Sequence, residues 1–397
     1  MGVSMRSKFR FLSMSTMIIF FLILVFSSFI SDKLLAMGSS EEKVSVEILP
    51  RLELLSGVLS QTIWMEIRGP KEKGNIYFQE LQKFFSNYKN HQAITIAKQL
   101  TQNGFTFDKP IIYILNLSEI PYLEATNGYS DNLIEIPKSE EILEDFRLAL
   151  IDLEKKSNFK EDFFDKHQSD YNRYIKNVQQ DLKGNELIEW MNNFYGYIHA
   201  GYHLVLAPAM FPSGGYGITI ENSNGEKEAY QIFRESGISE KEPVFYKKAL
   251  YYLSLHEWGH SFVNPAIERN REYINKYNLN QLLEPVKEIM RKQAYSNVET
   301  FLNEQILRGI TTYALKQNGK DYLKYETNRG FYLTEFTVEQ IEYYQANRDK
   351  FKTFDDFVPY LLEQYNENRG ELLNNASSVN ILSPKAPFYI NYFYFSH

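Results

Sequence analysis

Residues 256–265 read HEWGHSFVNP, and this stretch decides how the rest of the chain is interpreted. Its first five residues form the pattern HExxH, in which His256 and His260 lie four positions apart. On a helix, side chains with that spacing project from one face about one turn apart, so both imidazoles reach a single metal ion. Glu257 then lies beside the metal, where its carboxylate can take a proton from a water molecule and later pass it to a leaving amine. The stretch therefore predicts a helix that carries a zinc site.

Two histidines at this spacing also occur as a surface pair or as a buried hydrogen-bonded couple. The chain has only seven histidines, and random placement gives such a pentapeptide in roughly one chain of this composition in a hundred. The preceding residues, Tyr246–Leu255, contain neither Gly nor Pro, whereas Pro265 follows the motif. We therefore expect a buried helix over residues 245–263 that ends before Pro265, with the two histidines as its polar strip.

A catalytic zinc site usually has three protein ligands and one open position, so a third ligand is expected downstream. Val263 and Ala266 stand where the metzincin pattern needs its glycine and its third histidine, which excludes that subtype. The segment Tyr295–Leu315 has helical periodicity and contains Asn303-Glu304, which resembles the Asn-Glu pair that carries the third ligand in gluzincins. We predict Glu304 as the third ligand.

Glu299 is the rival third ligand in the same segment. It lies nearer the apolar stripe of the expected helix, whereas Glu304 shares a polar face with Arg308. A face that lines a cleft is expected to be polar, which favours Glu304. Arg308 is then either a substrate-binding clamp for a carboxylate or half of an ordinary surface ion pair with Glu304, and both interpretations stay open.

The decapeptide at 256–265, with Asn303-Glu304 and Arg308, resembles an uncharacterised family of secreted bacterial proteins assigned to the zincin-type metallopeptidases. Weaker matches are Glu53-Leu54-Leu55, Tyr88-Lys89-Asn90-His91 and Gly214-Gly215-Tyr216-Gly217. The resemblance runs through most of the exported part of the chain, and only the decapeptide is specific. It implies a zinc-dependent peptidase of the gluzincin type and supplies no substrate.

The first residues of the chain have the layout of a bacterial secretory signal. Arg6, Lys8 and Arg10 precede an uncharged stretch that runs from Phe11 to Ile30. We expect residues 1–38 to be cleaved off, or to remain as an N-terminal anchor, because the uncharged stretch is about long enough to cross a bilayer. The chain has no cysteine, which excludes disulfides and lipid attachment through a signal-peptide cysteine. The sequence therefore predicts a secreted or extracytoplasmic protein.

The remaining residues, 39–397, are enough for two lobes and a sizeable core. We expect a mostly helical N-terminal lobe over 39–195 and a zincin-like catalytic lobe over 196–397. The 29 Tyr and 29 Phe residues suit a large helical core. A net charge of −7, without a basic stripe, argues against nucleic acid as a partner. The expected partner is a peptide or protein substrate, with membrane contact only through an uncleaved N-terminal segment.

Most of the chain before the zinc helix has helical periodicity. We expect helices over 51–65, 75–87, 92–103 and 140–156, one or two helices over 159–195 with a break at 183–185, and strands over 44–49 and 111–117. Strand-like sequence returns over 202–207, 217–220 and 230–233. Zincin-type sites lay the substrate against an edge strand at this place. We therefore predict an α+β fold, mostly helical and zincin-like, with a small antiparallel sheet before the HExxH helix. Helices near 338–350 and 354–365 and a strand-like tail at 388–395 complete the pattern.

A donor for the developing oxyanion is expected in the strand-like region. Tyr216 and Tyr230 each carry a phenol that can make this hydrogen bond, and His199 and His203 are alternatives. We choose Tyr216. The competing interpretation is a glycine-rich hairpin turn with one packed aromatic ring.

The sequence as a whole predicts an exported zinc metallopeptidase. His256, His260 and Glu304 hold the metal, and Glu257 assists attack of zinc-bound water on a peptide bond. One alternative is a noncatalytic zinc-binding surface protein, whose site would be closed by four protein ligands. Another is a zinc amidase that acts on a cell-wall peptide through the same water activation. A different divalent metal suits two histidines and one carboxylate less well than zinc does.

Overall fold

The structure is a computed structural model, and it describes residues 44–63, 75–125, 133–134, 139–183, 186–209, 215–222, 224–316 and 319–377. The chain divides into two compact units, Met1–Lys43 and Val44–His397, and all described residues belong to the second. The expected leader at 1–38 and the strand-like tail at 388–395 lie outside the described residues. In the described ranges, no helix combines the length and the apolar character that a membrane span requires.

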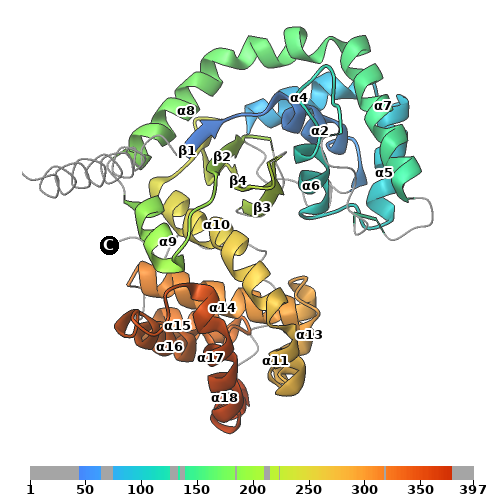
Figure 1. Cartoon of the computed structure of the whole chain (residues 1–397). Coiled ribbons are helices and arrows are strands. Elements are labelled where there is room, and N and C mark those ends of the chain that lie inside the picture. The colour runs from blue at the N-terminus through green and yellow to red at the C-terminus, as the bar shows by residue number, and fades with distance from the viewer. Residues whose placement is uncertain are drawn as a thin grey trace, which may run out of the picture. The chain divides into compact units, whose positions relative to one another are not determined.

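The described residues are mostly helical with two small sheets, which confirms the α+β expectation. The N-terminal helices are α2 (Pro50–Leu59), α4 (Ile76–Ser86), α5 (Gln92–Gln102), α6 (Lys109–Leu115) and α7 (Ser139–Ser157) (Figure 1). The helices expected over 75–87, 92–103 and 140–156 are therefore confirmed. Helix α2 ends before the expected residue 65, and residues 64 and 65 are not among those described.

The buried strand expected over 111–117 is wrong, because this segment is helix α6. Pro110 occupies the first turn of α6, where its missing N–H costs no helical hydrogen bond. Ile111, Ile114 and Leu115 are all buried, at the spacing of one helical face. A short apolar run of this kind does not reveal its period, so the sequence alone does not distinguish a buried strand from a buried helix.

The expected run of helices over 159–195 is confirmed, with a break. A π-helical turn (Lys160–Phe164) and a 3-10 turn (Asp165–His167) lead into α8 (Gln168–Leu182), and α9 (Leu187–Tyr195) follows. Gly184 and Asn185, which were expected to form the break, are not among the described residues. Helix α9 ends at Gly196, whose φ of 81° is a left-handed conformation that glycine adopts without strain.

Four strands form the main sheet in the order β1-β2-β4-β3: β1 (Val44–Glu47), β2 (Gly201–Ala207), β3 (Gly215–Glu221) and β4 (Lys227–Arg234). The expectation of a strand at 44–49 and of three strands before the HExxH helix is confirmed. The expectation of an antiparallel sheet is wrong, since β1 and β4 both run parallel to β2 and only β3 is antiparallel to its neighbour β4. The chain passes from β2 to the far edge, forms β3 there, and folds back as β4 between them. This return makes β4 parallel to β2 and leaves β3 at the edge.

The two faces of the sheet differ in what they contact. Tyr202 packs its ring on Trp258 of α10 (Lys247–Arg269), with ring centroids 5.4 Å apart. Gln231 accepts a hydrogen bond of 2.7 Å from Ser254 on the same helix. Because side chains alternate along a strand, the in-register residues His203 and Tyr230 project from the other face. Helix α10 therefore covers one face of the sheet only.

Helix α10 runs past its expected end, so the prediction that Pro265 stops it is wrong. Pro265 lies inside the helix, and the residues after it, Ala266 and Ile267, are fully buried. Proline removes one helical hydrogen bond, and burial of this last turn in the core outweighs the loss.

The C-terminal part of the described chain is helical. A small antiparallel hairpin, β5 (Gly237–Ser239) and β6 (Glu242–Val244), precedes α10. After α10 come α11 (Arg271–Lys276), α12 (Asn280–Leu283), a 3-10 turn (Glu284–Val286), α13 (Lys287–Lys292), α14 (Val298–Ala314), α15 (Lys320–Asn328), α16 (Thr334–Ala346), α17 (Phe354–Glu367) and α18 (Arg369–Ser377). Helix α14 packs against α10 (Figure 1). The helices expected near 338–350 and 354–365 are confirmed.

Candidate metal centre

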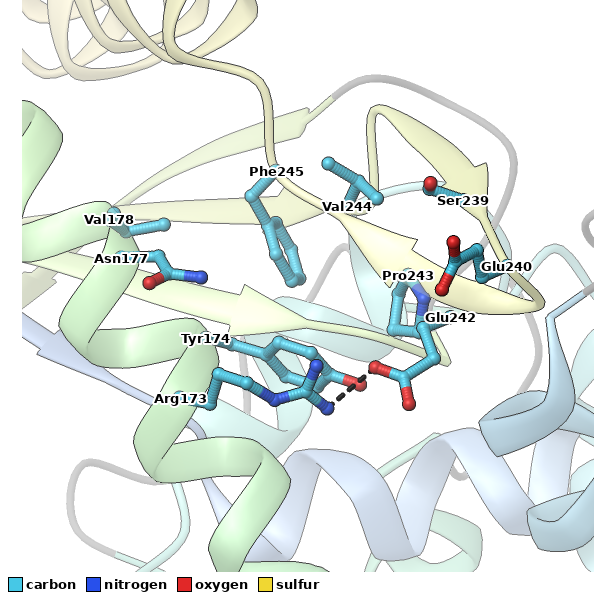
Figure 2. Close-up of a pocket in the computed structure, with 10 residues that line it drawn as sticks. All are labelled: Arg173, Tyr174, Asn177, Val178, Ser239, Glu240, Glu242, Pro243, Val244 and Phe245. Atoms are coloured by element: carbon cyan, nitrogen blue, oxygen red, sulfur yellow. Dashed lines mark ion pairs between the residues drawn. The ribbon is translucent and has the colours of Figure 1, made fainter.

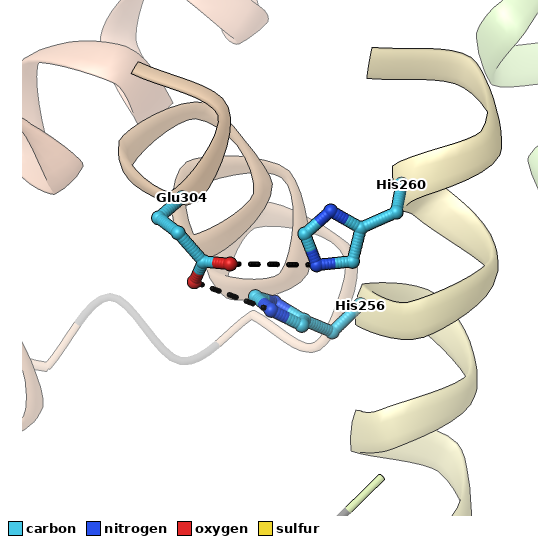
Figure 3. Close-up of side chains that lie close together, drawn as sticks. All are labelled: His256, His260 and Glu304. Atoms are coloured by element: carbon cyan, nitrogen blue, oxygen red, sulfur yellow. Dashed lines mark ion pairs between the residues drawn. The ribbon is translucent and has the colours of Figure 1, made fainter. Parts of the chain in front are cut away.

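Helices α10 and α14 bring three side chains to one point. His256 and His260 leave the same face of α10, and Glu304 faces them from α14 (Figure 3). The Nε2 atom of His256 lies 3.5 Å from one oxygen of Glu304, and the Nε2 atom of His260 lies 3.4 Å from the other. The three ligand atoms are within 4.8 Å of one another. This buried group can hold a metal ion.

A glycine inside the motif allows the two helices to approach closely. A Cβ atom at Gly259 would lie 2.6 Å from a side-chain carbon of Leu307 on α14. That distance is too short for real carbon atoms, so a larger residue would force the buried side chain of Leu307 to move. Helix α14 itself begins at a capped turn, in which Asn297 accepts a hydrogen bond of 2.9 Å from the N–H of Thr300. Together these features set the position of Glu304 relative to the two histidines.

The ring of His260 is oriented by a neighbour on its own helix. Its Nδ1 atom lies 3.1 Å from the side-chain oxygen of Asn264, which can only accept a hydrogen bond there. Because Asn264 holds Nδ1, the Nε2 atom is the ring nitrogen that faces Glu304 and that a metal would contact. Asn264 is part of the HEWGHSFVNP stretch, and this contact gives it a role in preparing His260 to bind a metal.

The pKa of Glu304 is lowered although the side chain is buried. Burial by itself raises the pKa, but the charges of His256, His260 and Arg308 and a hydrogen bond from His256 outweigh this effect. Glu304 is therefore ionised, as a metal ligand must be.

Glu257 lies beside the three ligands and is not one of them. Burial raises its pKa, and the charge of Glu304 adds to this, while the two histidines and a hydrogen bond from the N–H of Gly217 oppose it. A Cβ atom at Gly215 would lie 3.3 Å from an oxygen of Glu257, and one at Gly217 would lie 2.0 Å from its backbone oxygen. At Gly217 only glycine lets the edge strand β3 approach the motif so closely, and at Gly215 a side chain would be a tight fit.

Glu299, the rival ligand, lies elsewhere. Its carboxylate forms a two-pronged ion pair with Arg271, at 2.6 and 2.8 Å. It does not belong to the group that His256 and His260 form. Of the two glutamates that the sequence left open, only Glu304 faces the histidines.

Arg308 is buried, so its ion pair with Glu304, at 3.4 Å, is not a surface pair. Its other terminal nitrogen lies 3.5 Å from Glu326 on α15 and donates a bond of 3.2 Å to the hydroxyl of Tyr252. The guanidinium carbon lies 3.7 Å from the ring centroid of Phe331. Both terminal nitrogens therefore contact protein groups, and the arrangement gives no support to a clamp for a substrate carboxylate. Arg308 instead forms a buried ion pair with Glu304.

Sequence reasoning missed Glu326, which is almost fully buried between Arg308 and Arg329. It lies on a different helix from Arg308, and no spacing rule links the two positions. A polar residue at an otherwise buried helical position is the signal that a helical wheel of α15 offers. That signal does not identify the partner.

The structure does not bring the expected oxyanion donors to the group. Tyr216 lies between Gly215 and Gly217, whose missing side chains would face Glu257, so its own side chain leaves the opposite face of β3. Tyr230 stacks on His203 on that same face, with ring centroids 4.1 Å apart. The Nε2 atom of the buried His199 contacts the hydroxyl of Ser261 at 2.7 Å. The geometry therefore gives no support to the oxyanion role predicted for Tyr216.

A separate cavity of about 320 Å³ lies between α8 and the β5–β6 hairpin (Figure 2). Arg173 and Glu242 in its lining form an ion pair of 2.6 Å with each other. Arg173 also pairs with Asp170 at 2.7 Å. The lining contains none of the predicted site residues, so the chemistry indicated by the sequence belongs to the α10–α14 group.

Comparison with known proteins identifies one family model that matches this chain. Neither the curated proteins nor the solved structures contain a match to this chain. A family model described as a domain of unknown function, DUF4932, matches residues 44–364. The matched part runs from β1 into α17 and includes the sheet, the HExxH helix and Glu304. The chain therefore belongs to the family defined by the domain of unknown function DUF4932.

Proposed function

We propose that this protein is a zinc-dependent metallopeptidase. The observation that carries the proposal is the arrangement of four neighbouring side chains, of which three form a possible metal site and the fourth lies beside it. His256, His260 and Glu304 converge on one point, while the adjacent Glu257 stays out of the group and faces the edge strand β3. A metal site with a separate carboxylate beside it is the arrangement that Glu-assisted hydrolysis requires.

The donor set fits zinc. Two imidazole nitrogens and one carboxylate oxygen are ligands that zinc takes in catalytic sites, and a tetrahedral ion with these three keeps one position open. Among the described residues, no fourth His, Asp or Glu joins the three, which favours a catalytic site over a closed structural one. When bound, zinc would polarise the peptide carbonyl and lower the pKa of a water molecule.

Glu257 would be the general base. Its raised pKa brings the carboxylate closer to neutrality, so it can take a proton from the attacking water and keep it long enough to deliver it to the leaving amine. The hydrogen bond from Gly217 holds the carboxylate against β3. The base is therefore fixed in place before a substrate arrives.

The edge strand β3 is where we place the substrate. Only β4 pairs with it inside the main sheet, so one side of its backbone lacks a partner strand in that sheet. An extended peptide can add to such an edge through main-chain hydrogen bonds. Because β3 contacts Glu257 directly, a peptide bound there would pass beside the general base. The leader-like sequence at residues 1–38 supports action outside the cytoplasm, on secreted or surface peptides.

The decisive experiment separates metal binding from turnover. Full-length protein and the Glu257→Gln variant are analysed for zinc per chain and assayed on a peptide library. We expect one zinc in both proteins and a fall in cleavage of about 100-fold or more in the variant, the scale of a lost general base. Glu268→Gln, on the exposed part of the same helix, is the control and should cleave like the parent. Cleavage by Glu257→Gln at the parent rate would remove Glu257 from the mechanism. A zinc-free, well-folded parent would remove the proposal altogether.

A further inference from the structure

The metal centre has a neighbour in the turn that leads into α14. Tyr295 was expected inside this helix, but α14 begins at Val298. The backbone N–H of Tyr295 donates a bond of 2.9 Å to the carbonyl of Met290, at the end of α13. The residue before it, Ala294, has a φ of 72°. Tyr295 therefore belongs to the turn between α13 and α14 and not to the helix that carries Glu304.

An aromatic contact places the ring of Tyr295 beside the buried ion pair of the site. Its centroid lies 6.1 Å from that of Phe331, in an edge-to-face arrangement. The guanidinium of Arg308 lies 3.7 Å from the same Phe331 ring and pairs with Glu304. Tyr295 and Arg308 thus pack on one ring, which ties the position of Tyr295 to that of the metal ligand.

The hydroxyl of Tyr295 has no fixed partner among the described residues. The side chain is half-buried, and burial and the charges of Glu304 and Glu257 raise its pKa. A phenol whose hydroxyl has no fixed partner among the described residues therefore packs on the same Phe331 ring as the guanidinium that pairs with Glu304.

We propose that Tyr295 is a catalytic residue that donates a hydrogen bond to the oxyanion formed from the substrate carbonyl. This inference rests on the proposed function, and it assigns a residue that stabilises the transition state of peptide hydrolysis. Neither Arg308 nor Tyr216 fits this role, because the terminal nitrogens of Arg308 contact Glu304, Glu326 and Tyr252, and the side chain of Tyr216 leaves the far face of β3.

The step balances without any further reagent. The oxygen of water bonds to the carbonyl carbon, the electron pair of the C=O π bond moves to the carbonyl oxygen, and Glu257 takes one proton from the water. The hydroxyl of Tyr295 keeps its proton and donates a hydrogen bond to the new oxyanion. When the C–N bond breaks, its electron pair leaves with the amine, and Glu257 returns the proton to that nitrogen.

The test uses two readouts on full-length protein and on Tyr295→Phe, with Tyr122→Phe, at a tyrosine that is 70% exposed, as the matched control. The first is cleavage of a peptide substrate by zinc-loaded protein. We expect kcat of Tyr295→Phe to fall roughly 100- to 1000-fold, the usual effect of one lost oxyanion donor. KM and zinc content should stay close to those of the parent, and Tyr122→Phe should behave like the parent.

The second readout needs no turnover. Cobalt-loaded proteins are titrated with acetohydroxamate, a small ligand with oxygens that bind metals, and binding is followed by visible absorption. We expect Tyr295→Phe to bind it roughly 10- to 100-fold more weakly, as for loss of one hydrogen bond to a charged group. Equal affinity in parent and variant, with matching thermal unfolding, would overturn the role of Tyr295. If the parent cleaves no peptide, the proposed function fails, and the titration alone still decides whether the phenol donates to a ligand at the metal.

Discussion

Glu53 on α2 and Glu304 on α14 are both buried, at 0% and 5% exposure, yet their pKa values move in opposite directions. Burial raises the pKa of Glu53 to about 8, and the nearby Glu235 adds to this, while the hydrogen bond from Tyr77 offsets only part of it. Burial opposes ionisation of Glu304 as well, but three cationic neighbours outweigh it and lower the pKa. Of these two buried carboxylates, only the one with cationic neighbours has a lowered pKa.

The surroundings of Glu53 and Glu304 explain why their pKa values shift in opposite directions. Tyr77 donates a bond of 2.7 Å to Glu53 and lies 2.6 Å from the hydroxyl of Tyr171, so Glu53 belongs to a network of neutral groups that links α2, α4 and α8. Glu304 belongs to an ionic network that links α10, α14 and α15. The first network holds helices together. The second prepares an ionised ligand.

The largest expected effect contrasts the two glutamates directly. Glu304→Gln should weaken zinc binding by more than about 100-fold, because even an outer-shell partner of a metal ligand is worth 10- to 100-fold. Glu53→Gln should leave zinc affinity unchanged. Competition of each purified variant with a zinc-binding dye measures both affinities. Equal affinities in the two variants would mean that the α10–α14 group is not the zinc site.

A smaller effect on zinc affinity is expected when the positive charge of Arg308, which pairs with Glu304, is removed. Arg308→Met keeps an apolar stem over Phe331 and removes the charge that helps to ionise Glu304. We expect zinc affinity to fall roughly 10- to 100-fold, the scale of lost outer-shell partners. The same dye competition measures it, with the exposed Arg291→Met as the control. Unchanged affinity in Arg308→Met would show that the two histidines alone keep Glu304 ionised.

The smallest effect concerns stability against pH. Glu53 has a folded-state pKa of about 8, above the ordinary value of 4.5, so the folded protein binds the extra proton between these two pH values. The contribution of Glu53 to the free energy of unfolding is full below about pH 4.5, declines as the pH rises, and levels off above about pH 8. Urea unfolding at pH 5 and pH 9 measures the decline.

Glu53→Gln cannot ionise, so its stability should change less between those two pH values than that of the parent. Glu268→Gln, on the surface of α10, should show the full change of the parent. A parent whose stability does not decline from pH 5 to pH 9, or a Glu53→Gln variant that declines equally, would contradict the assignment of a raised pKa to Glu53.

Local features of the fold could be predicted because their causes are local. The i and i+4 spacing of His256 and His260 places both rings on one helical face whatever the rest of the chain does. The periodicity of residues 92–103 and 140–156 predicts helices for the same reason, and α5 and α7 confirm them. Prediction failed where two interactions compete. The run at 111–117 suits a strand or a helix, and Pro265 stops a helix only if no buried turn follows it.

By itself, the sequence determined that this protein carries an HExxH helix, that strands precede this helix, and that helices make up most of the rest. Each of these conclusions depends on neighbours within a few turns. Only the tertiary structure decided that Glu304 rather than Glu299 faces the histidines, and that Arg308 and Glu326 form a chain of buried ion pairs with it. These outcomes depend on how closely α10, α14 and α15 approach one another. That approach depends on packing between residues far apart in the chain, such as Gly259 against Leu307.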